Sequence, residues 1–172
     1  QMGELFKERT LKKYYLCIVK GRITEPAHIR GYLVKDEKTN RVSFSNGTSS
    51  KEANGLPIET EYLPIAWNQE MTLLKVHLIT GRTHQIRVHF SSIGHPLCGD
   101  PMYGANPVLS EALGLDRQWL HAMKLEFRHP RTRVWTTVRS QYPADLAAAL
   151  DAMRARHIEP AEPAEYAEVL VD

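Results

Sequence analysis

Runs of apolar side chains along the chain predict a protein built mainly from strands. Residues 13–20 are aromatic and β-branched, end at Gly21 and predict a buried strand. Further runs of strand length, separated by polar turns, occupy residues 29–34, 41–44, 58–67 and 71–79. Only three residues separate the last two runs, which favours an antiparallel hairpin. A second pair of strands is predicted at residues 119–127 and 134–139.

Helical spacing replaces this pattern directly after the 71–79 strand. Ile86, Phe90 and Ile93 fall at i, i+4 and i+7, so they predict one apolar face of a short helix. Thr83 is a suitable N-cap for this helix, and Gly94 is a suitable C-terminal cap. Helices are also expected at residues 3–11, 106–115 and 145–156.

The order of these elements predicts an α+β fold, because strands outnumber helices and no βαβ alternation occurs. The sheet is expected to be mixed and mainly antiparallel, with flanking helices. Residues 45–57 are rich in Ser, Asn, Gly and Lys and predict a mobile surface loop. Glutamates gather near the C-terminus, which predicts one domain over residues 1–158 and an acidic extension over residues 159–172.

Composition fits one globular domain, because the chain has 172 residues and 42% of them are hydrophobic. No apolar run approaches the roughly 18 residues that a membrane-spanning helix needs. Cys17 and Cys98 lie far apart in the sequence and no signal peptide is visible, so a cytoplasmic location is expected. Because the chain begins with Gln1, we expect a fragment or a processed product.

The net charge of +2 is too small to identify a nucleic-acid partner, so the local clustering of basic residues matters more. Basic clusters lie at residues 7–13, 77–89 and 128–133. In the central cluster, Arg87 falls on the first turns of the predicted helix, where backbone amides and an arginine fork can bind a carboxylate or phosphate. The alternative is a surface arginine without a special partner.

Other chemistry is poorly supported by the sequence. His84 and His89 are five residues apart rather than four, and no Cys-x-x-Cys or His-Glu-x-x-His motif accompanies them. We therefore expect no metal, and we interpret these histidines as hydrogen-bonding structural or RNA-contacting residues. No Gly-x-Ser-x-Gly elbow, phosphate-binding glycine loop or evident carboxylate pair occurs.

Tyr14 and Tyr15 follow two lysines in the first predicted strand. Aromatic rings beside basic residues can stack on an unpaired base. Because neighbouring strand residues point to opposite faces, only one of the two rings can serve a given site.

Several segments, in the same order along the chain, resemble the RluA-type RNA pseudouridine synthases. They are residues 12–15 with Val19 and Gly21, similar to the family's Lys-x-Tyr strand; residues 59–62, similar to its Thr-x-Tyr strand; residues 81–89 with 94–96 and 99–100, similar to its third motif; and residues 120–122 with 129–130, similar to its Leu-His-Ala…His-Pro segment. The resemblance runs from about residue 12 to residue 143. It implies isomerisation of uridine to pseudouridine in structured ribosomal or transfer RNA, without cofactor or metal.

The resemblance also implies roles for five residues. Arg87 corresponds to the arginine that pairs with the family's nucleophilic aspartate, which a cation keeps ionised and oriented. Tyr15 corresponds to the tyrosine that packs against the flipped uracil and takes part in proton transfer. Leu120 is implied to line the uracil pocket, and Arg82 and His84 to bind substrate.

One family motif has no match. The nucleophile belongs to a His-Arg-Leu-Asp…Thr-Ser-Gly motif upstream of the Lys-x-Tyr strand, and nothing in residues 1–11 resembles it. Asp116 does not fit as the nucleophile, because it follows the third motif instead of preceding the Lys-x-Tyr strand. Asp100 lies within the third motif, where a structural role suits it better. We therefore expect a partial catalytic domain that is inactive alone and able to dimerise through the sheet edges that truncation exposes.

Two alternatives to a truncated enzyme stay open. The chain can be a non-catalytic RNA-binding remnant of the same fold. It can also be a nucleic-acid hydrolase that uses His84 or His89 as a general base.

Overall fold

The fold is given by a computed structural model that describes residues 11–36, 38, 41–45, 55–82, 84–104, 107–156, 158–160 and 162–169. Its strands are β1 (Leu11–Lys20), β2 (Ala27–Asp36), β3 (Arg41–Ser45), β4 (Leu56–Trp67), β5 (Met71–Leu78), β6 (Leu120–Arg128), β7 (Trp135–Arg139) and β8 (Glu159–Pro160). Its helices are α2 (Gln85–Ser92), α3 (Pro107–Ala112), α4 (Ala144–Ala155) and α5 (Pro163–Val169).

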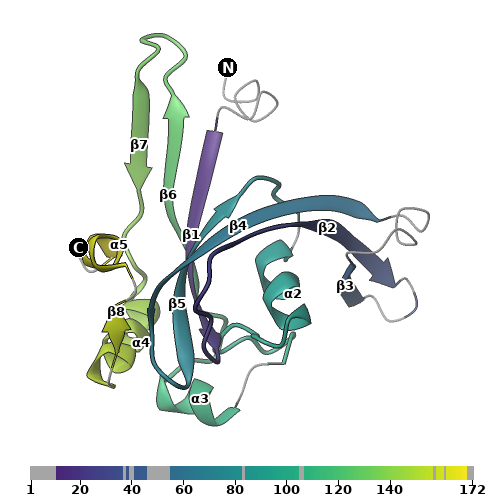
Figure 1. The fold of residues 1–172 in the computed structure, drawn as a ribbon, viewed down its shortest axis with the longest axis vertical. Helices are drawn as coiled ribbons and strands as arrows, with labels where there is room; N and C mark the ends of the chain where they lie inside the picture. The colour runs from purple at the N-terminus through teal and green to yellow at the C-terminus, as the bar shows by residue number, and fades with distance from the viewer. Residues whose placement is uncertain are drawn as a thin grey trace.

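The strands form one sheet in the order β3-β2-β4-β5-β1-β6-β7, and β8 pairs with β4 (Figure 1). All pairings among the described strands are antiparallel. The α+β fold with a mainly antiparallel sheet is therefore confirmed. The predicted hairpin is the β4–β5 unit, whose turn is closed by hydrogen bonds from the Glu70 and Met71 amides to the Asn68 side chain, 2.8 and 2.9 Å long.

Strand β1 lies between β5 and β6, and both of its faces are covered. Leu16 and Ile18 belong to the hydrophobic cluster that includes residues of α3 and α4. Cys17 and Val19 point the other way, into the cluster that includes residues of α2. A strand buried on both faces reads as a continuous apolar run, which explains the sequence of residues 16–19.

Helix α2 is buried more completely than a single apolar face requires. Ile86 and Phe90 pack into the cluster that includes β1, whereas Val88 packs against Leu33 and Ile58 from β2 and β4. Ile93 is the C-cap residue and is 39% exposed, so its predicted place on the core face is wrong. The helix is short and enclosed by the curved sheet and its loops, and polar as well as apolar positions are therefore buried.

The two ends of α2 differ from each other. At the C-terminus Gly94 has φ +82°, its amide donates to Ser91 O and the His95 amide donates to Phe90 O. This is the Schellman arrangement, so the predicted glycine cap is confirmed. At the N-terminus the cap position is occupied by His84, in the left-handed region with φ 57° and without a side-chain cap hydrogen bond. The cap predicted at Thr83 lies outside the described residues.

The acidic C-terminal segment is joined to the sheet. Strand β8 pairs with the end of β4, and Tyr166 of α5 packs against the core cluster. Lys75 on β5 donates to Glu165 on α5 at 2.9 Å. Neither β8 nor α5 was predicted, because a strand of two residues and a helix of seven residues carry little periodic signal.

Other expectations concern the ends and edges of the chain. The helix predicted at residues 3–11 and most of the loop predicted at residues 45–57 lie outside the described residues. Along the described sheet order the edge strands are β3 and β7, and dimerisation through such edges stays a prediction. No helix in the described ranges is long and apolar enough to cross a bilayer.

The turn after α2 offers a sharp test of this packing. Gly94 and Gly99 share φ +82°, but a Cβ on Gly99 would lie 2.0 Å from the carbonyl oxygen of Arg117, whereas a Cβ on Gly94 meets nothing within 4 Å. Gly94→Ala is expected to lower the free energy of unfolding by about 1 kcal/mol, because only backbone strain is added. Gly99→Ala is expected to lower it by roughly 2 kcal/mol more through the clash. Equal urea-denaturation midpoints for the two variants would contradict the packing described here.

Candidate functional site

A cavity of about 330 Å³ opens where β1, β6 and the N-terminus of α2 meet. Its lining includes every site residue predicted from the sequence. The polar lining residues are Lys13, Tyr15, Arg82, His84, Gln85, Arg87 and Gln118. The remaining lining residues are Leu78, Gly81, Ile86 and Leu120. No acidic side chain lines this cavity among the described residues, so the cavity favours an anionic or electron-rich ligand.

Different parts of the sheet bring these side chains together. Tyr15 comes from the middle of β1 and Leu120 from the first residue of β6, and both pack against the cluster that includes α2. Arg82 and His84 come from the connection between β5 and α2. Arg87 lies on the first turn of α2. The site therefore depends on long-range strand pairing that no local pattern contains.

Tyr14 and Tyr15 face opposite sides of the sheet, as the alternation of strand residues predicts. Tyr15 lines the cavity and is half-buried. Tyr14 stacks on His77 with ring centroids 4.9 Å apart, and the ammonium groups of Lys75 and Lys124 each lie 5.0 Å from its ring centroid. Only Tyr15 is therefore placed to act in this cavity.

Arg87 is held by a second side chain. Its Nε donates to Asp100 Oδ2 at 2.9 Å and its Nη2 donates to Asp100 Oδ1 at 2.8 Å. Both residues are buried, with Arg87 8% and Asp100 1% exposed. The alternative of a surface arginine without a special partner is therefore wrong. Within the described ranges the other three N–H groups of Arg87 have no acceptor, so one edge of the fork is left for a ligand.

Electrostatics keep this pair ionised. Hydrogen bonds to Asp100 raise the pKa of Arg87. Burial alone would raise the pKa of Asp100, but hydrogen bonds from Arg87 and from the amides of Met102 and Tyr103 lower it below its usual value. Asp100 is therefore a carboxylate at neutral pH, and its function in the structure is to orient Arg87.

Polar side chains at one face of α2 hold the turn that carries Asp100. His84 Nδ1 lies 3.1 Å from the Tyr103 hydroxyl, and the Ser91 hydroxyl donates to Tyr103 O at 2.7 Å. The guanidinium carbon of Arg87 lies 5.2 Å from the centroid of the Tyr103 ring. Three residues of one helix face, His84, Arg87 and Ser91, thus fix the turn from Asp100 to Tyr103.

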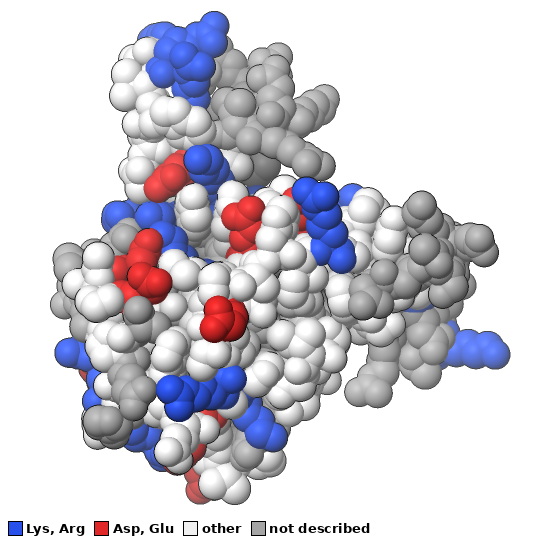
Figure 2. Space-filling model, in the orientation of Figure 1, with Lys and Arg blue, Asp and Glu red and all other residues white. Residues whose placement is uncertain are grey.

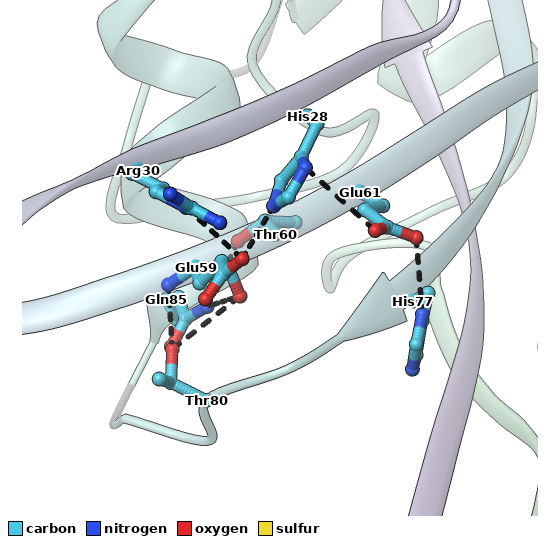
Figure 3. Close-up of polar contacts among 8 residues, drawn as sticks. All are labelled: His28, Arg30, Glu59, Thr60, Glu61, His77, Thr80 and Gln85. Atoms are coloured by element: carbon cyan, nitrogen blue, oxygen red, sulfur yellow. Dashed lines mark hydrogen bonds and ion pairs between the residues drawn. The ribbon is translucent and has the colours of Figure 1, made fainter.

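Gln85 fastens the start of α2 to the sheet (Figure 3). Its Oε1 accepts from the Thr80 hydroxyl and from the Arg82 amide, at 2.8 and 3.0 Å. Its Nε2 donates to Glu59 O and to the Thr60 hydroxyl, at 3.2 and 2.8 Å. A buried side-chain amide with all four of these hydrogen bonds fixes the helix in position. Gln85 was not predicted as a site residue, because a lone glutamine carries no motif.

Strand β4 also carries a network of polar side chains, drawn in Figure 3. Glu59 Oε2 accepts from His28 Nε2 at 2.5 Å and from Arg30 Nε at 3.1 Å, and the hydrogen bond from His28 is the main cause that lowers the pKa of Glu59. Glu61 lies 3.2 Å from His77 Nδ1. These contacts link β2, β4 and β5. They also hold Glu59, whose backbone carbonyl accepts a hydrogen bond from Gln85.

His89 does not have the role that its motif suggested. It is fully buried and lies against the rings of Phe44, Tyr62 and Phe90. Neither ring nitrogen has a hydrogen-bond partner among the described residues, so the predicted hydrogen-bonding or RNA-contacting role is wrong for His89. Burial lowers its pKa from 6.5 to about 4, so the ring is neutral at pH 7 and out of reach of a substrate.

Among the described residues no group of three His, Cys, Asp or Glu side chains is arranged to hold a metal ion. Lys13 and Gln118 line the cavity but were not predicted as site residues. Burial lowers the pKa of Lys13. Its position in the Lys-x-Tyr segment was the signal that could have identified it.

The neutral state of His89 makes stability depend on pH. In the unfolded chain His89 binds a proton near pH 6.5, whereas in the folded protein it does so only near pH 4. This contribution to stability is complete above pH 6.5 and is lost as the pH falls to about 4, by about 3 kcal/mol in all. His89→Phe is expected to make the free energy of unfolding depend less on pH between pH 7 and 4, as measured by urea denaturation. An unchanged slope would refute the burial of a neutral imidazole.

Comparisons with known proteins show the family of the chain. A family model described as RNA pseudouridylate synthase matches residues 1–92, more than half of the chain. An uncharacterized RNA pseudouridine synthase of Mycobacterium bovis is 44% identical over 149 residues, which cover 87% of this chain and 47% of that protein. The ribosomal large subunit pseudouridine synthase D of Nitrosomonas europaea is 40% identical over 157 residues, or 89% of this chain and 44% of that protein. The chain thus spans about half the length of these relatives.

Solved structures have the same fold. Human RNA pseudouridylate synthase domain containing 1 is 26% identical and superposes with a TM-score of 0.66, covering 89% of this chain and 69% of the human chain. Human RNA pseudouridylate synthase domain containing 4 is 21% identical and superposes with a TM-score of 0.70, covering 92% of this chain and 67% of the human chain. At this identity the likeness supports the fold alone. The family match and the relatives named above show that the chain belongs to the RNA pseudouridylate synthase family, of the RluA type.

Proposed function

We propose that this chain forms the uridine-binding part of the catalytic site of an RNA pseudouridine synthase. The observation that carries the proposal is the cavity that Tyr15, Arg87 and Leu120 line together. The basic residues Lys13 and Arg82 line the same cavity. These residues come from three segments that each resemble a family motif. The name of one relative, the ribosomal large subunit pseudouridine synthase D of Nitrosomonas europaea, makes ribosomal RNA the preferred substrate in this proposal.

The proposed reaction is an isomerisation in which no atom is lost overall. The bond between N1 of uracil and C1′ of ribose breaks, the base turns, and a bond between C5 and C1′ forms. C5 loses its proton and N1 gains one, so no oxidant, reductant or cofactor is consumed. The protein has to hold the free base in place, exclude competing water and move one proton.

In this proposal Arg87 serves a carboxylate nucleophile. Asp100 occupies one edge of the guanidinium, and the remaining edge can bind a second carboxylate and keep it ionised. No acidic side chain lines the cavity within the described residues, and no segment of the sequence matches the family's His-Arg-Leu-Asp motif. On the ground of the missing motif, we propose that the nucleophile comes from outside these 172 residues. The chain alone would then bind RNA without converting it.

Tyr15 and Leu120 would hold the flipped uracil between an aromatic ring and an aliphatic side chain. A base taken out of its stack loses contacts that such apolar walls replace. Arg82 is exposed, donates to Pro57 O at 3.3 Å and lies on the rim, where a phosphate of the flipped nucleotide can reach it. His84 lies beside it and is fixed by Tyr103.

The competing functions differ in what they require. A hydrolase that uses His89 as a base is contradicted by the burial of that ring, and His84 stays the only histidine on the cavity among the described residues. A non-catalytic RNA-binding remnant requires the same cavity but no nucleophile.

A reducing compartment such as the cytoplasm is part of the proposal, because Cys17 and Cys98 are free, buried thiols.

A chimera tests the proposed function directly. In it, this chain replaces the matching 149 residues of the Mycobacterium bovis relative, so that the rest of that protein is supplied. On RNA labelled with tritium at C5 of uridine, the chimera is expected to release tritium as the C5–C1′ bond forms, and the 172-residue chain alone is expected to release none. A folded chimera without release would contradict the synthase proposal. Release by the chain alone would refute an external nucleophile.

Arg87→Ala and Arg87→Lys in the chimera are both expected to lower tritium release by about 100-fold or more, because lysine cannot orient a carboxylate as the arginine fork does. RNA binding, measured by fluorescence anisotropy, should change by less than about threefold. Arg82→Lys is the matched control, since it keeps a charge on the rim, and it should leave release nearly unchanged. Normal release by Arg87→Lys would overturn the role given to Arg87.

Tyr15 is expected to act through both its ring and its hydroxyl. Tyr15→Leu should weaken RNA binding by the chimera about tenfold, because base stacking on an aromatic ring is lost. Tyr15→Phe should keep binding but lower tritium release, and Tyr14→Phe on the opposite sheet face should do neither. Release by Tyr15→Phe at the unmutated rate would remove the hydroxyl from proton transfer.

A further inference from the structure

We propose that the tip of the β6–β7 hairpin, made by Arg128, Arg131 and Arg133, binds the phosphate backbone of RNA outside the target nucleotide. The inference rests on the proposed function only for the choice of RNA as the partner. The hairpin extends well beyond the rest of the sheet (Figure 1). Its arginines were singled out in the sequence, yet none of them lines the cavity.

The tip has charge of one sign. Residues 127–144 contain four arginines and no aspartate or glutamate. Arg128, Arg131 and Arg133 are all exposed. Figure 2 shows Lys and Arg side chains gathered at the far end of the hairpin, whereas acidic and basic residues are mixed over the body of the molecule. A basic cluster of this kind is the usual electrostatic footprint of a phosphate-binding surface.

The tip is also held in one conformation. Arg128 Nε donates to Arg133 O at 3.0 Å across the turn. His129 Nδ1 accepts from the Arg131 and Thr132 amides at 3.2 and 3.3 Å. Arg133 adopts the left-handed region with φ 64°, which reverses the chain within this short turn. A fixed turn lowers the conformational entropy lost when a ligand binds.

An exposed aromatic ring lies beside these charges. Trp135 is 54% exposed and pairs across the hairpin with Arg128. The ammonium group of Lys12 lies 5.1 Å from its ring centroid. An exposed ring beside basic residues suits an unpaired base attached to a bound phosphate backbone, which favours RNA over an acidic protein or an anionic membrane.

The distance from the cavity defines what the tip can reach. Leu120 lines the cavity at one end of β6, and Arg128 is the last residue of the same strand. Eight steps along an antiparallel strand amount to about 26 Å. One nucleotide cannot contact both places, so the tip would bind a neighbouring part of a structured RNA and orient it on the sheet.

A pair of charge-removing variants of the 172-residue chain tests the proposal. The tip variant carries Arg131→Gln and Arg133→Gln and leaves Arg128 in place, because Arg128 supports the turn. The matched control carries Lys35→Gln and Arg154→Gln, exposed positions on β2 and α4 that remove the same net charge. Binding to a structured, uridine-containing RNA is measured by fluorescence anisotropy over a series of salt concentrations.

The tip variant is expected to bind about tenfold more weakly at low salt, and the slope of log K against log salt should shrink by about 1.5. The control should stay within about twofold of the unmutated chain, and Arg131→Lys with Arg133→Lys should retain most of the binding. Equal losses in tip variant and control would overturn the proposal. So would a tip variant that loses binding to phosphatidylserine vesicles but keeps RNA binding. Because no turnover is measured, an inactive synthase would leave this result intact.

Discussion

The ion pair between Arg87 and Asp100 is the interaction on which the site depends. It joins helix α2 to the turn that follows it, and two parallel hydrogen bonds fix the guanidinium plane. A buried pair of this kind adds little net stability, because desolvation offsets most of the attraction. The pair instead orients Arg87, because Asp100 leaves one edge of the guanidinium directed at the cavity. The same carboxylate accepts hydrogen bonds from the backbone amides that shape the Asp100–Tyr103 turn.

Strand β1 provides the second constraint. Because it is central and covered on both faces, its side chains alternate between two clusters, and Tyr15 is thereby placed on the α2 side with Leu120 and Arg87. A shift of register by one residue would bring Tyr14 to the cavity instead. The irregularity between Tyr14 and Tyr15 against β6 lies at this point, so the pairing with β5 and β6 together fixes which tyrosine serves the site.

The sequence predicted the elements whose periodicity is strong. The continuous apolar run of β1 and the helical spacing of Ile86 and Phe90 in α2 are local features, and the structure follows them. Ile93 and His89 were misjudged because their burial depends on how the curved sheet encloses α2, which no helical stripe encodes. The pairing of Arg87 with Asp100 was likewise beyond local reasoning. Asp100 is 13 positions after Arg87 in the sequence, and only the fold of the turn brings the carboxylate to the fork.

Binding of a uridine nucleotide to the cavity is the most direct test of this account. Methyl groups of Leu78, Ile86 and Leu120 line it, whereas Leu63 lies beside Tyr14 on the opposite sheet face. In an NMR titration of the methyl-labelled chain with uridine 5′-monophosphate, we expect saturable shifts at Leu78, Ile86 and Leu120 and none at Leu63. Shifts confined to Leu63, or no saturable shift at the three cavity residues, would contradict it.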